Sequence, residues 1–271
     1  MTKFTKILAV VAMLWLISAQ ATPLMAYDFK VGQLYYKVTD AANRKVAVVP
    51  ENSSYPYNNN CPTGAISIPA TVVNGGNTYS VTSVGVGAFY CCTELAAINI
   101  PSGVTSIEAY TFEKCSGLTS ISIPSGVTKI EKGTFSGCEG LTSIDIPNGV
   151  TSIGASAFYG CKGLTSINIP NGITKIENST FSGCKGLTSI NIPNSVTSIG
   201  NSAFYGCEGL NSIDIPNGVT SIGERAFYGC KGLTAITVPN GITKIEKGTF
   251  INCIYNHRTT KTNQKYPSVN L

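Results

Sequence analysis

The chain has few charged residues, because lysine, arginine, aspartate and glutamate make up only 12% of its 271 residues, about half of the usual share. Its formal net charge of +5 equals the charge of five basic residues close to the two ends: Lys3, Lys6, Arg258, Lys261 and Lys265. The rest of the chain is neutral. Proteins that bind nucleic acid gather lysine and arginine on a folded face, so this balance argues against nucleic acid as a partner.

The chain also lacks a hydrophobic run long enough to span a membrane. The apolar stretch from Ile7 to Ile17 follows a basic start and precedes small residues, and it is too short for a membrane helix. This order of segments is typical of a signal peptide, so we expect residues 1–26 to be removed on export. Cleavage after Ala21 and cleavage after Ala26 both fit, and Ala26 is favoured. With no later apolar span and no cysteine near either position, we expect a secreted or surface-associated chain without a lipid anchor or a transmembrane span.

A repeat of 23 residues dominates what is present. Eight phenylalanines are evenly spaced by 23: Phe89, Phe112, Phe135, Phe158, Phe181, Phe204, Phe227 and Phe250. Eight cysteines share this spacing: Cys92, Cys115, Cys138, Cys161, Cys184, Cys207, Cys230 and Cys253. A fixed period of this length indicates supersecondary units that stack into a solenoid. We expect the solenoid to cover residues 61–253, with one irregular repeat followed by about seven regular ones.

Each unit contains one clear strand signal. Residues 164–169 end in an alternation of apolar and polar residues, which predicts a strand with one buried face. Pro170 ends the strand, and Ile-Pro-Asn-Gly fits a type I turn with proline second and glycine fourth. Ile173 and Ile176 then point inward, and Phe181 lies in a short return that is irregular, helical or 3₁₀. We therefore expect a β-rich solenoid of right-handed 23-residue coils, with a parallel sheet on its concave face.

Residues 27–60 predict a small N-terminal β cap. Phe29 to Val31 and Leu34 to Val38 flank Gly32-Gln33 as a hairpin, and Lys45 to Val49 predicts a third strand. Nine extra residues around Asn74-Gly75-Gly76-Asn77 make the first repeat irregular and carry a hairpin-turn signature. The polar tail, residues 254–271, has no pattern that would cover the last coil, which leaves that coil open to self-association.

The repeated unit, Cys-x-x-Leu-x-x-Ile-x-Ile-Pro-x-x-Val-x-x-Ile-x-x-x-Ala/Thr-Phe, resembles the BspA-like leucine-rich repeat family of bacterial surface and secreted proteins. The resemblance covers residues 66–253, and Tyr27-Asp28-Phe29 looks like the usual mature start of that family. It implies a leucine-rich repeat solenoid, export or surface display, and, for some members, adhesion to extracellular-matrix proteins or to other cells. It brings no fixed set of binding residues.

The cysteines predict neither a metal site nor a disulfide between neighbouring coils. Equivalent residues of stacked coils lie about 4.8 Å apart with parallel Cβ atoms, an arrangement that disfavours a disulfide. We therefore expect the eight in-register cysteines to be buried thiols. Cys61 and Cys91 fall outside this register, and they are either both free or joined to each other. Metal binding needs convergent ligands, and the single histidine, His257, lies in the tail, so we expect no metal.

Catalysis is not indicated, because Asp145 and Asp214 share one repeat position three coils apart, about 14 Å, too far for a carboxylate pair. Two surface rows remain as candidate binding sites. The first, on the strand face, contains Ser120, Ser143, Ser166, Ser189 and Ser212 in one file and Asn99, Ser122, Asp145, Asn168, Asn191, Asp214 and Thr237 in the next. The second is aromatic and contains Tyr90, Tyr159, Tyr205 and Tyr228. Ordinary solvent-facing polar and edge residues would produce the same rows without any ligand.

These observations favour an adhesin-type binding protein without cofactors over an enzyme. Its expected ligand is an extracellular-matrix protein or a cell-surface glycan, because the strand face spans a macromolecular length of about 30 Å. The alternative is a passive structural or antigenic surface protein that self-assembles through its last coil.

Overall fold

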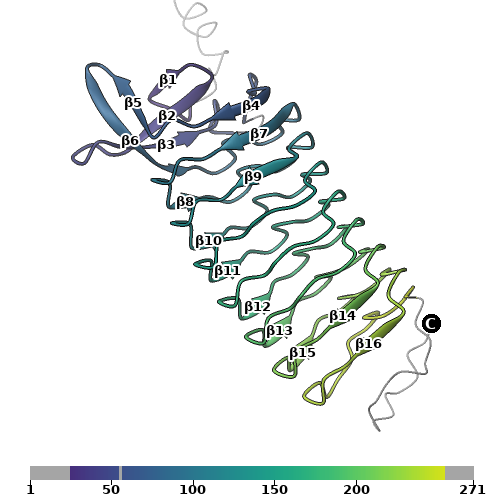
Figure 1. The fold of residues 1–271 in the computed structure, drawn as a ribbon. Helices are drawn as coiled ribbons and strands as arrows, with labels where there is room; N and C mark the ends of the chain where they lie inside the picture. The colour runs from purple at the N-terminus through teal and green to yellow at the C-terminus, as the bar shows by residue number, and fades with distance from the viewer. Residues whose placement is uncertain (1–24, 55–56, 254–271) are drawn as a thin grey trace, which may run out of the picture.

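The computed structural model describes residues 25–54 and 57–253, which form one elongated stack of coils with a group of strands at its N-terminal end (Figure 1). The described residues contain strands and turns and no helix. Most of the expected signal peptide and the whole polar tail lie outside the described residues. A β-rich repeat fold was expected, and the structure confirms it.

The N-terminal group of strands forms a mixed sheet. Its members are β1 (Phe29–Val31), β2 (Leu34–Asp40), β3 (Lys45–Val49), β5 (Thr71–Asn74) and β6 (Asn77–Val84). β1, β2 and β3 pair antiparallel, β3 pairs parallel with β6, and β5 pairs antiparallel with β6. The turn between β5 and β6 uses Gly75 and Gly76 at φ of 56° and 77°, a conformation that glycine adopts without steric cost. The expected hairpins therefore form at the expected residues.

The strand expected in each repeat builds one parallel ladder along the stack. Its strands are β4 (Gly64–Ser67), β7 (Leu95–Asn99), β9 (Ser120–Ser122), β14 (Ser212–Asp214) and β16 (Ala235–Thr237). Equivalent residues pair across coils, as Ile98 does with Ile121, and single bridges such as Asn168 with Asn191 continue the ladder where no full strand is formed. Parallel pairing 23 residues apart is what the sequence period requires.

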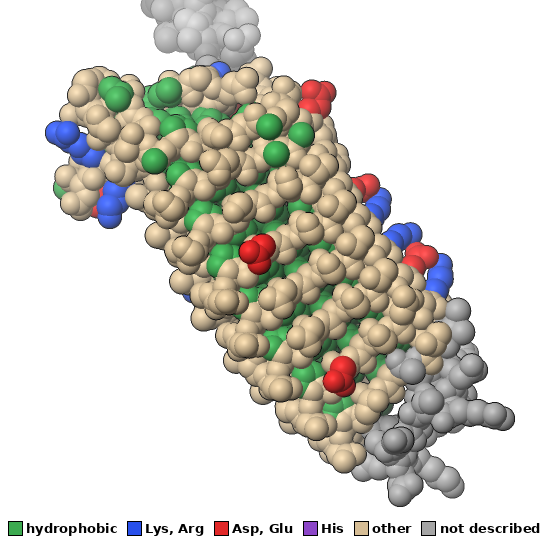
Figure 2. All heavy atoms as spheres, in the orientation of Figure 1, with side chains coloured by type: hydrophobic (Ala, Val, Ile, Leu, Met, Phe, Trp, Pro, Cys, Tyr) green, Lys and Arg blue, Asp and Glu red, His purple; other side chains and the backbone are tan. Residues whose placement is uncertain are grey.

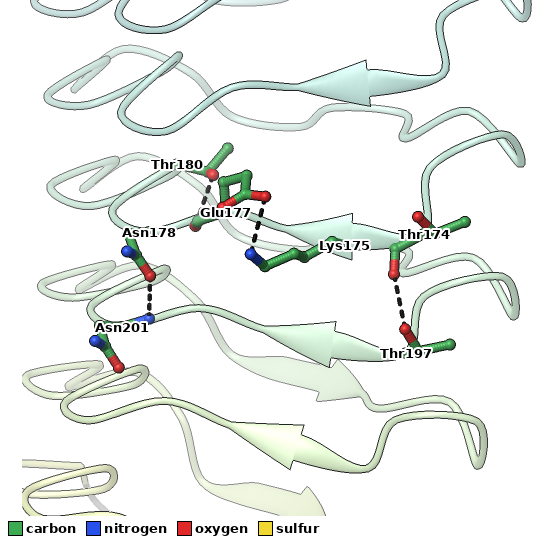
Figure 3. Close-up of polar contacts among 7 residues, drawn as sticks. All are labelled: Thr174, Lys175, Glu177, Asn178, Thr180, Thr197 and Asn201. Atoms are coloured by element: carbon green, nitrogen blue, oxygen red, sulfur yellow. Dashed lines mark hydrogen bonds and ion pairs between the residues drawn. The ribbon is translucent and has the colours of Figure 1, made fainter.

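A second row of short parallel strands forms where the sequence indicated only two inward isoleucines. Its strands are β8 (Ser106–Ile107), β10 (Lys129–Ile130), β11 (Ser152–Ile153), β12 (Lys175–Ile176), β13 (Ser198–Ile199) and β15 (Ser221–Ile222). These strands pair in separate groups: β8 with β6, β10 with β11, and β12 with β13 and β15. Polar side chains join its coils: Thr197 donates to the carbonyl of Thr174 at 3.2 Å, and the Asn178 side chain accepts the Asn201 N–H at 2.8 Å (Figure 3). Two-residue strands carry too little alternation to be recognised from sequence.

The turn after each first-ladder strand begins one residue later than expected. The proline carbonyl accepts the N–H three residues on, as Pro147 does from Val150 at 2.9 Å and Pro193 from Val196 at 3.0 Å. Proline therefore stands first in the turn and not second. The shift is compatible with proline chemistry, because proline lacks a donor but keeps its carbonyl acceptor. It also leaves Val150 fully buried in the core.

The core is a set of parallel stacks of identical side chains. The phenylalanine rings stack nearly parallel, with centroids 5.3–5.6 Å apart from Phe89 to Phe250. Leu164, Ile167 and Ile176 and their equivalents fill the space between the first ladder and the second row of strands. Each coil alone leaves these side chains half covered, so stability arises from stacking between neighbours.

Seven free cysteines form what we call the thiol ladder: Cys115, Cys138, Cys161, Cys184, Cys207, Cys230 and Cys253. Each thiol donates to the carbonyl of the phenylalanine 26 residues earlier, at 3.0–3.1 Å. Burial raises the pKa of Cys115 to about 12 and raises the pKa of Cys161 well above its ordinary value. The six buried thiols from Cys115 to Cys230 therefore remain protonated and unreactive in the native state, whereas hydrogen bonding with the Cys230 thiol lowers the pKa of the partly exposed Cys253.

The expectation for the eighth in-register cysteine is wrong. Cys92 forms a disulfide with Cys61, with Cα atoms 5.2 Å apart, and Cys91 is free and exposed. Neither a free Cys92 nor a Cys61–Cys91 bond is observed. The nine extra residues of the first repeat place its equivalent residues 32 positions apart, as in the pair Ile66 and Ile98, so the 26-residue spacing of the other thiols does not apply to Cys92. The pairing register also shifts between Gly64 and Ala65, which breaks the strict equivalence that disfavours a disulfide.

Thiol titration tests this arrangement. We expect the unreduced chain to show eight free thiols once unfolded, because two of its ten cysteines are joined. In the native chain Ellman's reagent should label Cys91 rapidly and the half-buried Cys253 more slowly, while the six fully buried thiols stay unlabelled. Ten reactive groups in the unfolded, unreduced chain would contradict the disulfide, and fewer than eight would contradict the free thiol ladder.

Candidate binding surfaces

The expected polar rows lie together on the outward side of the first ladder, which we call the strand face. Ser143, Ser166, Asn168 and Asn191 are exposed, as are all other members of the two files. Pairing in register places Asn99 beside Ser122, and Asn191 beside both Asn168 and Asp214. The serine, asparagine and aspartate side chains that the alternation predicts to face outward therefore do so, while the isoleucines between them point into the core.

The strand face carries little charge. Asp145 and Asp214 are its acidic members, and acidic groups stand apart among neutral side chains on this side of the molecule (Figure 2). Charges gather along its edge instead, where Lys162 pairs with Glu139 at 2.7 Å and Glu208 pairs with Lys185 at 2.9 Å. These ion pairs are half exposed and contribute little to stability. A neutral central face with a balanced charged edge suits a partner that binds through hydrogen bonds and apolar contacts.

A hollow of about 450 Å³ opens at the N-terminal end of the strand face. Its lining consists of Ala65, Ile66, Ser67, Ala97, Ile98, Asn99, Ser120, Ile121 and Ser122. Ile98 and Ile121 in this lining are only 4% and 8% exposed, like the isoleucines of later coils, whereas Ala65 is exposed and Ile66 and Ala97 are partly exposed. The sequence did not predict this hollow, because its lining includes β4, the edge strand of the irregular first repeat.

The four tyrosines of the aromatic row lie in different surroundings in the structure. Tyr205 and Tyr228 stack with centroids 4.9 Å apart, and Asn252 donates to the Tyr228 hydroxyl. Tyr159 is 50% exposed and is separated from Tyr205 by the coil that carries Ser182 at the same position. Tyr90 belongs to a different environment at the N-terminal end, where its ring contacts Tyr57.

The described residues contain no cluster of histidine, cysteine, aspartate or glutamate that could hold a metal ion. Within the same residues no helix is long and apolar enough to cross a membrane.

Comparison with known proteins identifies the repeat. The family model of the BspA type leucine-rich repeat region matches residues 58–188 and 175–267. A leucine-rich repeat protein from Bacteroides ovatus ATCC 8483 is 29% identical with a TM-score of 0.52, and the alignment covers 84% of this chain and 71% of that one. The leucine-rich repeat protein of T. pallidum is 24% identical with a TM-score of 0.61, covering 76% of this chain and 90% of that one. No curated protein matches the chain.

Proposed function

Because the chain belongs to the BspA-type leucine-rich repeat family, we propose that it is a secreted or surface-associated binding protein that recognises an extracellular macromolecule through its strand face. The observation that carries the proposal is the strand face itself, whose exposed serine, asparagine and aspartate side chains repeat in register over successive coils. Solenoids use extended faces of this kind to bind partners.

The chemistry of the strand face favours a protein ligand, such as an extracellular-matrix protein. The hollow beside Ala97 offers apolar surface at Ala65, Ile66 and Ala97 next to serine and asparagine side chains, which matches an interface with an apolar centre and a polar rim. The long neutral surface beyond it supplies hydrogen-bonding groups along the stack. A cell-surface glycan that uses only the polar rows is the alternative ligand, and the same experiment distinguishes it.

The double variant Asn168→Lys, Asn191→Lys tests the strand face. The two side chains are exposed and adjacent, so lysine buries nothing and should leave the melting temperature unchanged. We expect capture of immobilised matrix proteins, or of a glycan array if the alternative holds, to weaken at least about tenfold, because two charges must be desolvated at the centre of the interface.

The matched control replaces the aromatic row. Tyr159→Ser, Tyr205→Ser and Tyr228→Ser together imitate Ser136 and Ser182, which occupy the same position in other coils. Under the proposal this variant binds as the unaltered chain does. Loss of binding in the tyrosine variant, with the lysine variant unaffected, would transfer the function to the aromatic row.

One observation supports a second candidate function, structural self-assembly. At the C-terminal end of the described residues β16 pairs only with β14, and Ile245 and Phe250 are partly exposed although Ile222 and Phe227 are buried. Sedimentation that shows oligomers growing with concentration, and disappearing when a capping repeat is fused after Cys253, would favour this function over ligand binding.

A further inference from the structure

A second hollow, of about 310 Å³, lies between the segment that follows β3 and the first regular coils. We call it the tyrosine hollow; it is lined by Tyr57, Val86, Gly87, Tyr90, Tyr110 and Glu113. None of these residues belongs to the strand face. Val86 is 50% exposed, and the rings of Tyr57 and Tyr90 meet edge to face with centroids 5.3 Å apart. Exposed aromatic and apolar surface is thus concentrated at one place outside the strand face.

The coils around the tyrosine hollow depart from the pattern of the rest of the array. Tyr110 and Lys114 adopt left-handed backbone conformations, with φ of 59° and 61°. Most other coils hold small residues at the Tyr110 position, namely Gly87, Gly133, Ser156, Ser179, Ser202 and Gly248, and one coil holds Arg225. Later coils hold glycine at the Lys114 position: Gly137, Gly160, Gly183, Gly206 and Gly229. The left-handed φ is shared by the equivalent residues of the other coils, so Tyr110 and Lys114 depart from the array in side-chain size, at positions where glycine is strained least.

The surrounding residues hold the tyrosines in place. A Cβ atom on Gly133 would stand 2.5 Å from the Tyr110 ring, so glycine in the next coil makes room for that ring. The Lys132 ammonium lies 5.7 Å from the centre of the Tyr110 ring. The Lys114 ammonium donates to the Tyr90 hydroxyl at 2.8 Å. Side chains fixed before a ligand arrives lose less entropy when it binds.

Both a hydrogen-bond acceptor and a hydrogen-bond donor border these rings. Glu113 is partly buried in the lining, and this burial raises the pKa of its carboxyl group. Its carboxylate accepts hydrogen bonds, whereas the neighbouring Lys114 ammonium donates them. Tyrosine rings supply flat apolar faces beside these two groups.

We propose that the tyrosine hollow binds one neutral pyranose unit of a glycan. A pyranose has an apolar C–H face that packs on a tyrosine ring, and its hydroxyl groups both donate and accept, which matches Glu113 and Lys114. The volume lies at the lower end of ligand sites, about 300–1,000 Å³, and fits a single sugar unit. The carboxylate of Glu113 disfavours an acidic sugar. This site is independent of the strand face and of the ligand proposed for it.

Saturation-transfer NMR of the mature chain tests the proposal with four probes: methyl glucopyranoside, methyl galactopyranoside, methyl mannopyranoside and N-acetylglucosamine. We expect at least one of them to bind with a dissociation constant on the order of 1 mM, as for other ligands of this size. Tyr110→Ser, which imitates Ser156, should raise that constant about tenfold, and Glu113→Ser, which imitates Ser136, should raise it severalfold. Both variants should keep the native melting temperature, because they copy residues that the array already contains.

Tyr205→Ser serves as the matched control, since it removes a tyrosine of the aromatic row that lies outside the tyrosine hollow and should leave sugar binding unchanged. The proposal is overturned if none of the four sugars gives a signal, if Tyr110→Ser and Glu113→Ser bind as the unaltered chain does, or if Tyr205→Ser weakens binding equally. Asn168→Lys with Asn191→Lys should not affect sugar binding, so failure at the tyrosine hollow and failure at the strand face are separate results.

Discussion

Replacing Phe158 by alanine should destabilise the whole array by about 3–5 kcal/mol, the cost of truncating a fully buried phenylalanine. The Phe158 ring is fully buried and stacks between Phe135 and Phe181 at 5.5 and 5.6 Å. Because coils are stable only through their neighbours, a cavity in the middle weakens the stacking on both sides. Urea unfolding followed by circular dichroism measures the loss as a lower midpoint.

Tyr159→Ser is the control for this experiment, because it changes the adjacent but exposed residue to the serine of other coils. Its free energy of unfolding should stay within about 0.5 kcal/mol of that of the unaltered chain. A loss under about 1 kcal/mol for Phe158→Ala would show that the phenylalanine stack is not a principal source of stability.

Removing the disulfide with Cys61→Ser and Cys92→Ser should lower the free energy of unfolding by about 3–4 kcal/mol. This is the loop-closure value for a separation of 31 residues. The bond closes a loop that contains β5 and β6, and therefore ties the strands of the N-terminal sheet to the first coil. We expect amide hydrogen exchange to accelerate first in β2, β3 and β6, while the central coils keep their protection.

Cys91→Gly is the matched control for the disulfide variant. Cys91 is free and has φ of 63° at a position where five later coils carry glycine: Gly137, Gly160, Gly183, Gly206 and Gly229. Glycine relieves the strain of a side chain in this conformation, so stability should be unchanged or slightly higher. Equal destabilisation by Cys91→Gly would indicate that Cys91 and not Cys92 holds the bond with Cys61.

Features that recur in every coil could be predicted from the sequence. The period of 23 set the stacking, the alternation around Ile167 identified the outward residues, and Asn74-Gly75-Gly76-Asn77 identified a hairpin. Each of these signals depends on local geometry, or on a pattern repeated often enough to exclude chance.

Features that occur once could not be predicted in this way. The partner of Cys61 depends on a register shift next to Gly64, and the hollow beside Ala97 lies at β4, the edge strand of the irregular first repeat. Tyr57 reaches Tyr90 from a segment with no repeat signal, so their contact cannot be read from spacing. The sequence therefore predicts the regular coils well and the first coils poorly. Both hollows lie at those first coils.

The hydrogen bonds between coils allow the number of coils to change while each coil keeps its fold. Thr197 reaches Thr174 and Cys184 reaches Phe158 across sequence separations of 23 and 26 residues, and the same separations recur along the array. Loss of one whole period, such as residues 148–170, would therefore give every donor an equivalent acceptor in the next coil. A deletion that is not a whole number of periods would break this register. Duplication or loss of whole periods can thus change the length of the strand face in steps of about 4.8 Å.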